Sequence, residues 1–203
     1  MRTRVDPERP APRHLKAAVQ ALVRGEVIVY PSDTGYAFGC LPQSSKGVAT
    51  LRKLKRIDER HRKPLSMLVG DLGDFGRYGQ MSNAAFRVIR RLLPGPYTIV
   101  LKATSDVPRA VRNRDHELGL RIPDHAVCRM LVELLEGPLL IGSVTSSDAE
   151  PELEEPDDIA RRSGSSVTHV LDAGYLWPEP STVLRFVDDD MDVVRVGQGP
   201  VPS

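Results

Sequence analysis

Hydroxyl, carboxylate and guanidinium side chains gather where predicted strands of this sequence end. In the stretch VIVYPSDTGYAFGC (27–40), Ser32, Asp33 and Thr34 follow a short apolar run directly, and in LGLRIPDH, Arg121 stands late in another predicted strand. Ligands of open α/β sheets bind outside the carboxyl ends of the strands. Arginine binds phosphate and carboxylate groups, often through two parallel hydrogen bonds. This pattern predicts a site for a nucleotide together with a small carboxylate.

Three further strand ends carry groups of the same kind. The segment GPLLIGSVTSSD supplies Ser143 and Thr145, PSTVLRF supplies Ser181, and VVRVGQG supplies Arg195 followed by glycines. Glycine lets the backbone take a positive φ or approach a ligand closely. The recurrence of hydroxyls, arginines and glycines at strand ends shifts the balance toward a ligand site.

Each group also has a purely structural interpretation. The PSDT stretch is typical of a Ser/Asx turn leaving a strand, with Gly35 and Gly39 serving the turn geometry. Because Pro31 lacks an N–H, the ladder must end there or run along an edge of the sheet. The structural alternative for Arg121 is a surface ion pair. From PSDT alone, the turn interpretation is the stronger.

Helices and strands alternate along the chain. The predicted helices cover residues 12–24, 44–54, 82–93, 125–136 and 156–162, with N-caps at Ser44 or Ser45, at Ser82 and at Asp124. The predicted strands cover 27–30, 64–69, 97–103, 118–123, 138–144, 167–171, 181–187 and 192–196. No repeat or linker divides the chain. We therefore predict one α/β domain on a twisted mixed sheet over residues 12–199, preceded by a loose polar arm at 1–11.

Composition and charge exclude several classes of protein. Of 203 residues, 40% are hydrophobic and 27% charged, as in soluble globular proteins, and no apolar run approaches the ~20 residues that span a membrane. We expect no membrane partner. The spacing of Cys40 and Cys128 matches neither a disulfide framework nor a metal-binding motif. We therefore expect the protein to be located in a reducing cytoplasm. A Cys40 nucleophile, which would need a nearby base, is a minor alternative.

Charge is distributed unevenly, although the net charge is only +1. Residues 52–63 contain seven basic side chains, and residues 148–158 contain seven acidic ones and no basic one. A concentrated basic segment in a near-neutral chain indicates a local anionic ligand, or else a solvated helix face. The phosphate loop GxxxxGK[ST], the GxGxxG fingerprint and the zinc motifs HExxH and CxxC are all absent. We therefore expect no metal site built by protein ligands.

Six segments, taken in order, resemble the YrdC/TsaC family of threonylcarbamoyl-adenylate synthases. They are PSDTGYAFG (31–39), KPLSMLV (63–69), LPGPYTIVL (93–101), LRIPDHA (120–126), PLLIGSVT (138–145), and PSTVLRF with VRVG (180–186 and 194–197). The resemblance covers residues 12–199. It implies the family's twisted sheet with flanking helices around a concave, electropositive cavity.

The resemblance also implies an activity and its site. L-threonine, bicarbonate and ATP, with Mg²⁺, would give threonylcarbamoyl-AMP and pyrophosphate, and partner proteins would transfer the threonylcarbamoyl group to a tRNA adenosine. Positioned cations would stabilise the phosphate charge that builds as pyrophosphate leaves. The implied catalytic residues are Lys55, Ser143 and Thr145. The implied ATP-binding residues are Lys55, Lys63, Ser143, Ser181 and Arg195, and the implied threonine-binding residues are Ser32, Thr34, Arg121 and Ser181.

The sequence departs from the family pattern at two motifs. The family's Lys-x-Arg aligns either as Lys55-Arg56-Ile57 or as Lys53-Leu54-Lys55, and its Ser-x-Asn is Ser143-Val144-Thr145 here. The segments KRIDERHRKPL, YPSDTGYA and GYLWPEPSTV look most like the YciO branch. Two alternatives therefore stay open: a protein that binds double-stranded RNA or tRNA through phosphates and 2′-hydroxyls, and a nucleotide-binding relative with another acceptor. The near-neutral net charge favours a local cavity over a broad RNA surface.

Overall fold

The computed structural model of the chain describes residues 1–57, 64–144, 155–187 and 190–202. Its helices are α1 (Pro12–Val23), α2 (Ser45–Leu54), α3 (Leu72–Tyr78), α4 (Asn83–Leu92), α5 (Ala126–Leu135) and α6 (Pro156–Ser163), followed by the short 3-10 helix η1 (Gly164–Ser166). Its strands are β1 (Arg2–Arg4), β2 (Ile28–Ser32), β3 (Gly35–Cys40), β4 (Ser66–Leu68), β5 (Gly79–Gln80), β6 (Tyr97–Ala103), β7 (Glu117–Arg121), β8 (Leu139–Ser143), β9 (His169–Asp172), β10 (Thr182–Val187) and β11 (Asp190–Arg195).

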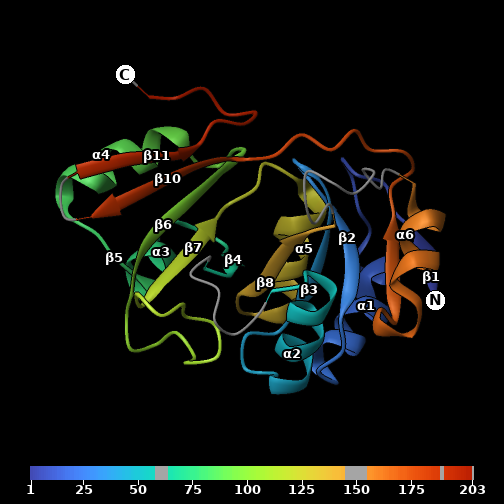
Figure 1. Cartoon of the computed structure of the whole chain (residues 1–203). Helices are drawn as coiled ribbons and strands as arrows, with labels where there is room; N and C mark the ends of the chain where they lie inside the picture. The colour runs from blue at the N-terminus through green and yellow to red at the C-terminus, as the bar shows by residue number, and fades with distance from the viewer. Residues whose placement is uncertain (58–63, 145–154, 188–189, 203) are drawn as a thin grey trace.

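The strands form one mixed sheet, as the sequence predicts. Their order is β1-β9-β2-β3-β8-β4-β7-β6-β10-β11, and β5 pairs with β6. The sheet twists strongly: in Figure 1, β10 and β11 run across the view, whereas β2 runs up it. Because of this twist, strands that are several places apart in the sheet can bring their ends to one region.

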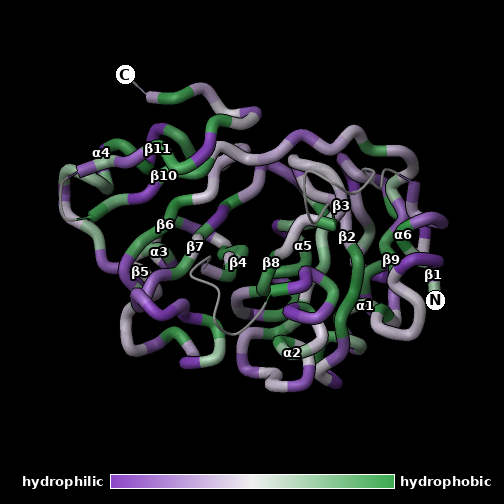
Figure 2. Tube along the Cα trace, in the orientation of Figure 1, coloured by the Kyte–Doolittle hydropathy of each residue, from purple (hydrophilic) through white to green (hydrophobic). Residues whose placement is uncertain are grey.

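Apolar side chains cover both faces of the sheet. Alternate residues of β2 point to opposite faces, so Val29 joins the core under α2, α3, α4 and α6, while Ile28 and Tyr30 join the core under α1 and α5. Figure 2 shows hydrophobic strands in the interior and hydrophilic stretches mainly in the connections. Among the described residues, no helix has the length and apolar character needed to cross a membrane.

The stretch around PSDT forms a β-hairpin rather than a strand followed by a loop. Strand β2 continues through Pro31 and Ser32, which pair with Tyr36 and Gly35 of β3. The parallel partner β9 pairs with β2 only at Ile28 and Val29. Pro31 therefore lies where that side of β2 is an edge, which is one of the two placements that its missing N–H allows.

The N-terminal residues differ from the loose arm that we predicted. Strand β1 pairs in parallel with β9, and the amino group of Met1 donates to the carbonyl of Thr168 at 2.9 Å. Val5 is buried beside this strand. Strand pairing uses backbone groups, which a polar, proline-rich composition does not reveal.

Two of the predicted helix caps are confirmed and one is wrong. The hydroxyls of Ser44 and Ser82 accept N–H bonds at the starts of α2 and α4. Asp124 does not cap α5, because Nδ1 of His125 accepts from the N–H of Val127 at 3.2 Å and takes that role. The Asp124 carboxylate instead accepts from Arg129 on the surface.

Close packing in the hairpin generates a stability prediction. A Cβ added at Gly39 would lie 2.6 Å from the ring of Tyr30 and 3.1 Å from Leu139. Gly39→Ala should therefore lower the free energy of unfolding by about 1–3 kcal/mol, measured by urea denaturation. The matched control is Gly76→Ala in α3, where the nearest atom lies 3.9 Å away. It should raise stability by about 0.5–1 kcal/mol through helix propensity. A Gly39→Ala protein as stable as the wild type would contradict this account.

Candidate functional site

Arg121, at the end of β7, reaches the tip of the β2–β3 hairpin. Its Nη2 donates to Oδ1 of Asp33 at 2.7 Å, and its Nη1 donates to Oγ1 of Thr34 at 3.0 Å. The side chains of Arg121 and Asp33 are 7% and 9% exposed, so this is a buried ion pair and not the surface pair of the structural alternative. Nε of Arg121 is buried and has no hydrogen-bond partner among the described residues. One donor of a buried guanidinium thus lacks an acceptor within the described part of the chain.

Ser32 shapes the turn that presents Thr34. Its hydroxyl donates to the carbonyl of Gly35 at 2.7 Å and accepts from the N–H of Thr34 at 3.3 Å. Gly35 has φ +96°, and a Cβ there would lie 3.1 Å from Cα of Pro178, so the turn requires glycine. The turn interpretation thus holds for Ser32 and Gly35, and a role of Ser32 in binding threonine stays a prediction.

Ser181 and Arg195 form a second cluster at the start of β10 and the end of β11. Nε and Nη2 of Arg195 both donate to the carbonyl of Ser181, at 3.0 and 2.7 Å, and Nη2 also donates to the Ser181 hydroxyl at 3.1 Å. The Ser181 hydroxyl shares a hydrogen bond of 2.8 Å with Oγ1 of Thr98 on β6. Two of the five predicted ATP-binding residues are therefore in contact.

The two arginines act on one another electrostatically. Burial lowers the pKa of Arg195, and the positive charge of Arg121 lowers it further. Burial raises the pKa of the Asp33 carboxyl, and the charge of Arg121 opposes that rise. Asp33 is thus paired with Arg121, and the charge of Arg121 also reaches Arg195.

Lys55 and Ser143 meet at the end of β8. Nζ of Lys55, just past α2, donates to the carbonyl of Ser143 at 2.5 Å, and its aliphatic stem covers Gly142. Ser143 pairs with Ala37 of β3, so this contact borders the strand that leads away from the hairpin tip. Two of the three predicted catalytic residues are thus in contact, with the lysine donating to the backbone carbonyl of the serine.

The hairpin also contacts the segment that precedes Ser181. The hydroxyl of Tyr36 donates to the carbonyl of Gly174 at 2.7 Å and accepts from the N–H of Ala173 at 2.9 Å. Figure 1 shows this connection running along one end of the sheet from β9 to β10. The β2–β3 hairpin therefore contacts both Arg121 and the connection that leads to Ser181.

Sequence reasoning missed two members of the site and placed two others on residues that the structure does not describe. Asp33 stood in the quoted motif without a role, and Thr98 had no signal, because its partner Ser181 is distant in sequence. Lys63 and Thr145, expected in ATP binding and catalysis, lie outside the described residues. Their expected roles stay predictions.

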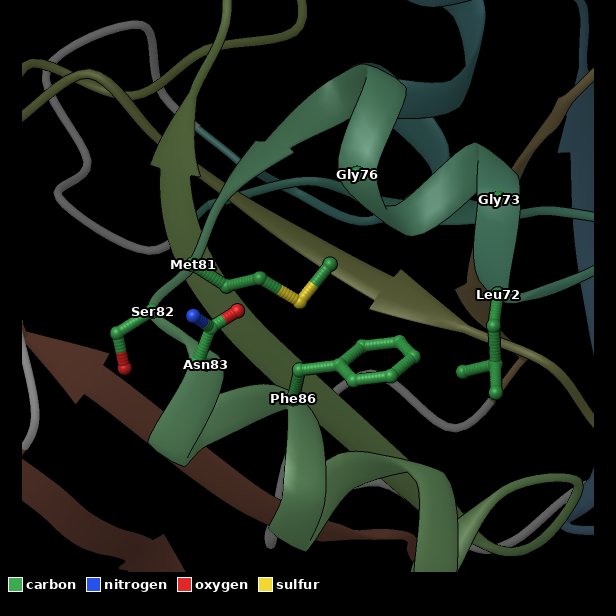
Figure 3. Close-up of a pocket in the computed structure, with 7 residues that line it drawn as sticks. All are labelled: Leu72, Gly73, Gly76, Met81, Ser82, Asn83 and Phe86. Atoms are coloured by element: carbon green, nitrogen blue, oxygen red, sulfur yellow. The ribbon is translucent and has the colours of Figure 1, made fainter.

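A hollow of about 370 Å³ lies away from these residues, between α3 and the start of α4. Figure 3 shows Met81 and Phe86 extending into the space beside α3, which Gly73 and Gly76 leave bare. Its lining is mostly apolar and includes no arginine or lysine. It does not fit the electropositive cavity implied by the resemblance, because phosphate binding requires donors and positive charge.

Comparisons with known proteins agree with this architecture. A family model named Sua5_yciO_yrdC, described as "Telomere recombination", matches residues 20–197. The uncharacterized protein YciO of Escherichia coli (strain K12) is 32% identical over 198 residues, which cover 97% of this chain and 95% of that protein. The threonylcarbamoyl-AMP synthase of Homo sapiens is 30% identical over 189 residues, which cover 93% of this chain and 59% of that protein.

Solved structures share the fold. The crystal structure of E. coli YciO has a TM-score of 0.92 at 31% identity, covering 98% of this chain and 97% of that one. The structure of P. abyssi Sua5 complexed with L-threonine has a TM-score of 0.85 at 21% identity, covering 97% of this chain and 57% of that one. At 21% identity, the likeness to Sua5 shows the fold alone.

The cysteines generate a prediction about reactivity. Both are buried, and burial raises the pKa of Cys40 to about 12 and raises that of Cys128 as well. Because the thiolate is the nucleophile, neither thiol should react with Ellman's reagent at pH 8 in the folded protein, and both should react after unfolding in guanidinium. Rapid labelling of Cys40 in the folded protein would revive the cysteine-nucleophile alternative.

Proposed function

The chain belongs to the Sua5/YciO/YrdC family, and from this premise we propose that it joins L-threonine, bicarbonate and ATP into threonylcarbamoyl-AMP with release of pyrophosphate. The observation that carries the proposal is the buried guanidinium of Arg121, which Asp33 and Thr34 hold and whose Nε has no partner among the described residues. Such a group binds a carboxylate or phosphate oxygen in place of the missing partner.

The site residues divide into two groups in this proposal. Arg121 and Thr34 bind the threonine carboxylate, with Ser32 and Ser181 nearby. Lys55, Ser143, Ser181 and Arg195 bind ATP, and Lys63 and Thr145 are expected to join them. Threonine and bicarbonate first give a carbamate and water. A carbamate oxygen then attacks the α-phosphorus, and the bond to the β-phosphate oxygen breaks as pyrophosphate leaves. The cations stabilise the negative charge that develops on the phosphates.

Mg²⁺ would enter with ATP in this scheme. The described residues contain no group of three or more His, Cys, Asp or Glu side chains that could hold a metal ion. Mg²⁺ is often held mainly by substrate phosphates and water, which needs no such group.

The relatives support the substrates proposed. The human relative is named a threonylcarbamoyl-AMP synthase, and the P. abyssi Sua5 that shares the fold was crystallised with L-threonine. We propose further that partner proteins transfer the threonylcarbamoyl group to tRNA. A soluble, cytoplasmic location is part of the same proposal.

The activity is tested by pyrophosphate release. Pyrophosphate should form only when ATP, L-threonine and bicarbonate are all present. Lys55→Ala and Arg195→Ala should each lower the rate by at least ~10²-fold, because each removes a charge placed to stabilise the phosphates. Matched controls are Lys46→Ala and Arg129→Ala, which change exposed cations outside the site. ATP turnover that is indifferent to threonine would contradict the proposal.

RNA binding is the second candidate, and one observation favours it. Arg87, Arg90 and Arg91 are all exposed on α4, a helix without an acidic residue. If they contact RNA phosphates, tRNA affinity should fall steeply between 50 and 200 mM salt, and replacing all three by alanine should reduce the slope of log K against log salt by ~2–3. Filter binding over a salt series measures this. Such binding without any adenylate formed would favour this candidate over the synthase, and salt-independent binding would exclude it.

A further inference from the structure

We infer that Asp33 is a positioning residue: it fixes the Arg121 guanidinium so that the unpartnered Nε–H faces an anionic group of the substrate. The identity of that group, the carboxylate of threonine, rests on the proposed function. The positioning itself rests on the geometry of the hairpin and can be tested without any substrate.

The contacts of Asp33 tie three elements together. Oδ1 accepts from Nη2 of Arg121 at 2.7 Å, and Oδ2 accepts from the backbone N–H of Asp124 at 3.3 Å, just before α5. Thr34 accepts from the other terminal nitrogen of Arg121 at 3.0 Å. Both ends of the guanidinium are therefore held from the hairpin, and its plane is fixed.

Asp33 also supplies the negative charge in the cluster. Arg121 is buried, whereas Arg195 is an exposed residue of β11 whose pKa is lowered by partial burial and by the charge of Arg121. Without the carboxylate, the buried guanidinium of Arg121 would carry an uncompensated charge.

A second Arg–carboxylate pair in the chain shows what a purely structural pair looks like. Nε and Nη2 of Arg185 both donate to Oε1 of Glu117, at 2.8 and 2.6 Å. Oε2 of Glu117 accepts from Asn113 at 3.2 Å. In that pair Nε of the arginine donates a hydrogen bond, whereas Nε of Arg121 is buried without an acceptor in the part of the chain that the structure describes. Glu117 is therefore the matched control for Asp33.

The test follows the arginine side chain directly. Arginine-selective NMR of the protein without substrate should show slow rotation of the Arg121 guanidinium in the wild type. Asp33→Asn keeps the shape but removes the charge, so rotation should become faster. Asp33→Glu, which restores the charge on a longer side chain, should recover part of the restriction. Glu117→Gln should leave Arg121 unchanged, and a thermal melt of each variant reports whether it is folded.

Steady-state kinetics supply the second measurement. Asp33→Asn should raise KM for L-threonine by at least ~10-fold, which is the size expected for a disturbed hydrogen bond to a charged group, while KM for ATP changes much less. Glu117→Gln should lower the free energy of unfolding without altering the ratio of KM for L-threonine to KM for ATP. A structural role alone would not separate the two KM values.

Each outcome bears on the inference. Arg121 rotation that is equally slow in folded Asp33→Asn overturns it, and so does an unchanged threonine KM in an active enzyme. Faster rotation in Asp33→Asn together with an inactive wild type overturns the proposed function and upholds the positioning. If Asp33→Asn does not fold, Asp33→Glu decides: Arg121 rotation that is faster than in the wild type but still partly restricted, unlike in Glu117→Gln, supports the inference, and wild-type rotation overturns it.

Discussion

The buried contact between the hairpin tip and Arg121 is the interaction on which the arrangement of the site depends. It joins residues 88 positions apart in the chain and links the middle of the sheet, at β2 and β3, to the end of β7. A buried ion pair of this kind contributes little net stability, but the loss of one partner leaves an uncompensated charge that costs about 3–5 kcal/mol. The pair is therefore better explained by the position it gives to Arg121 than by its contribution to stability.

The twist of the sheet makes the contact possible. In the sheet order, β8 and β4 separate β3 from β7, so a flat sheet would keep the hairpin tip and the end of β7 apart. The same twist brings β10 and β11 across the end of the molecule, where Arg195 holds the Ser181 backbone. Hydrogen bonds of Tyr36 fix the β9–β10 connection against β3. The site thus forms where distant strands meet, and local sequence encodes only its separate parts.

Much of the fold could be predicted from the sequence, because local signals determine it. The apolar spacing and Pro12 indicate α1, the run YTIVLKA indicates β6, and serine caps mark the starts of α2 and α4. Local sequence signals fail where tertiary packing determines the secondary structure. Strand β1 depends on backbone pairing with β9, and α3 contains two glycines, which disfavour a helix in isolation.

In the site, too, the sequence indicated individual residues but not the long-range contacts between them. Residue types at strand ends indicated Thr34, Arg121, Ser181 and Arg195, and the structure places them in two contacting pairs. Sequence could not show that Asp33 pairs with Arg121 or that Thr98 shares a hydrogen bond with Ser181, since both contacts cross the sheet.

The most direct test of the central claim is a crystal structure with L-threonine and a non-hydrolysable ATP analogue. We predict that a carboxylate oxygen of threonine lies within hydrogen-bond distance of Nε of Arg121, with the phosphates of the analogue near Lys55 and Arg195. Threonine bound elsewhere, with Nε of Arg121 still unpartnered, would contradict the account. So would the nucleotide analogue in the apolar hollow between α3 and α4.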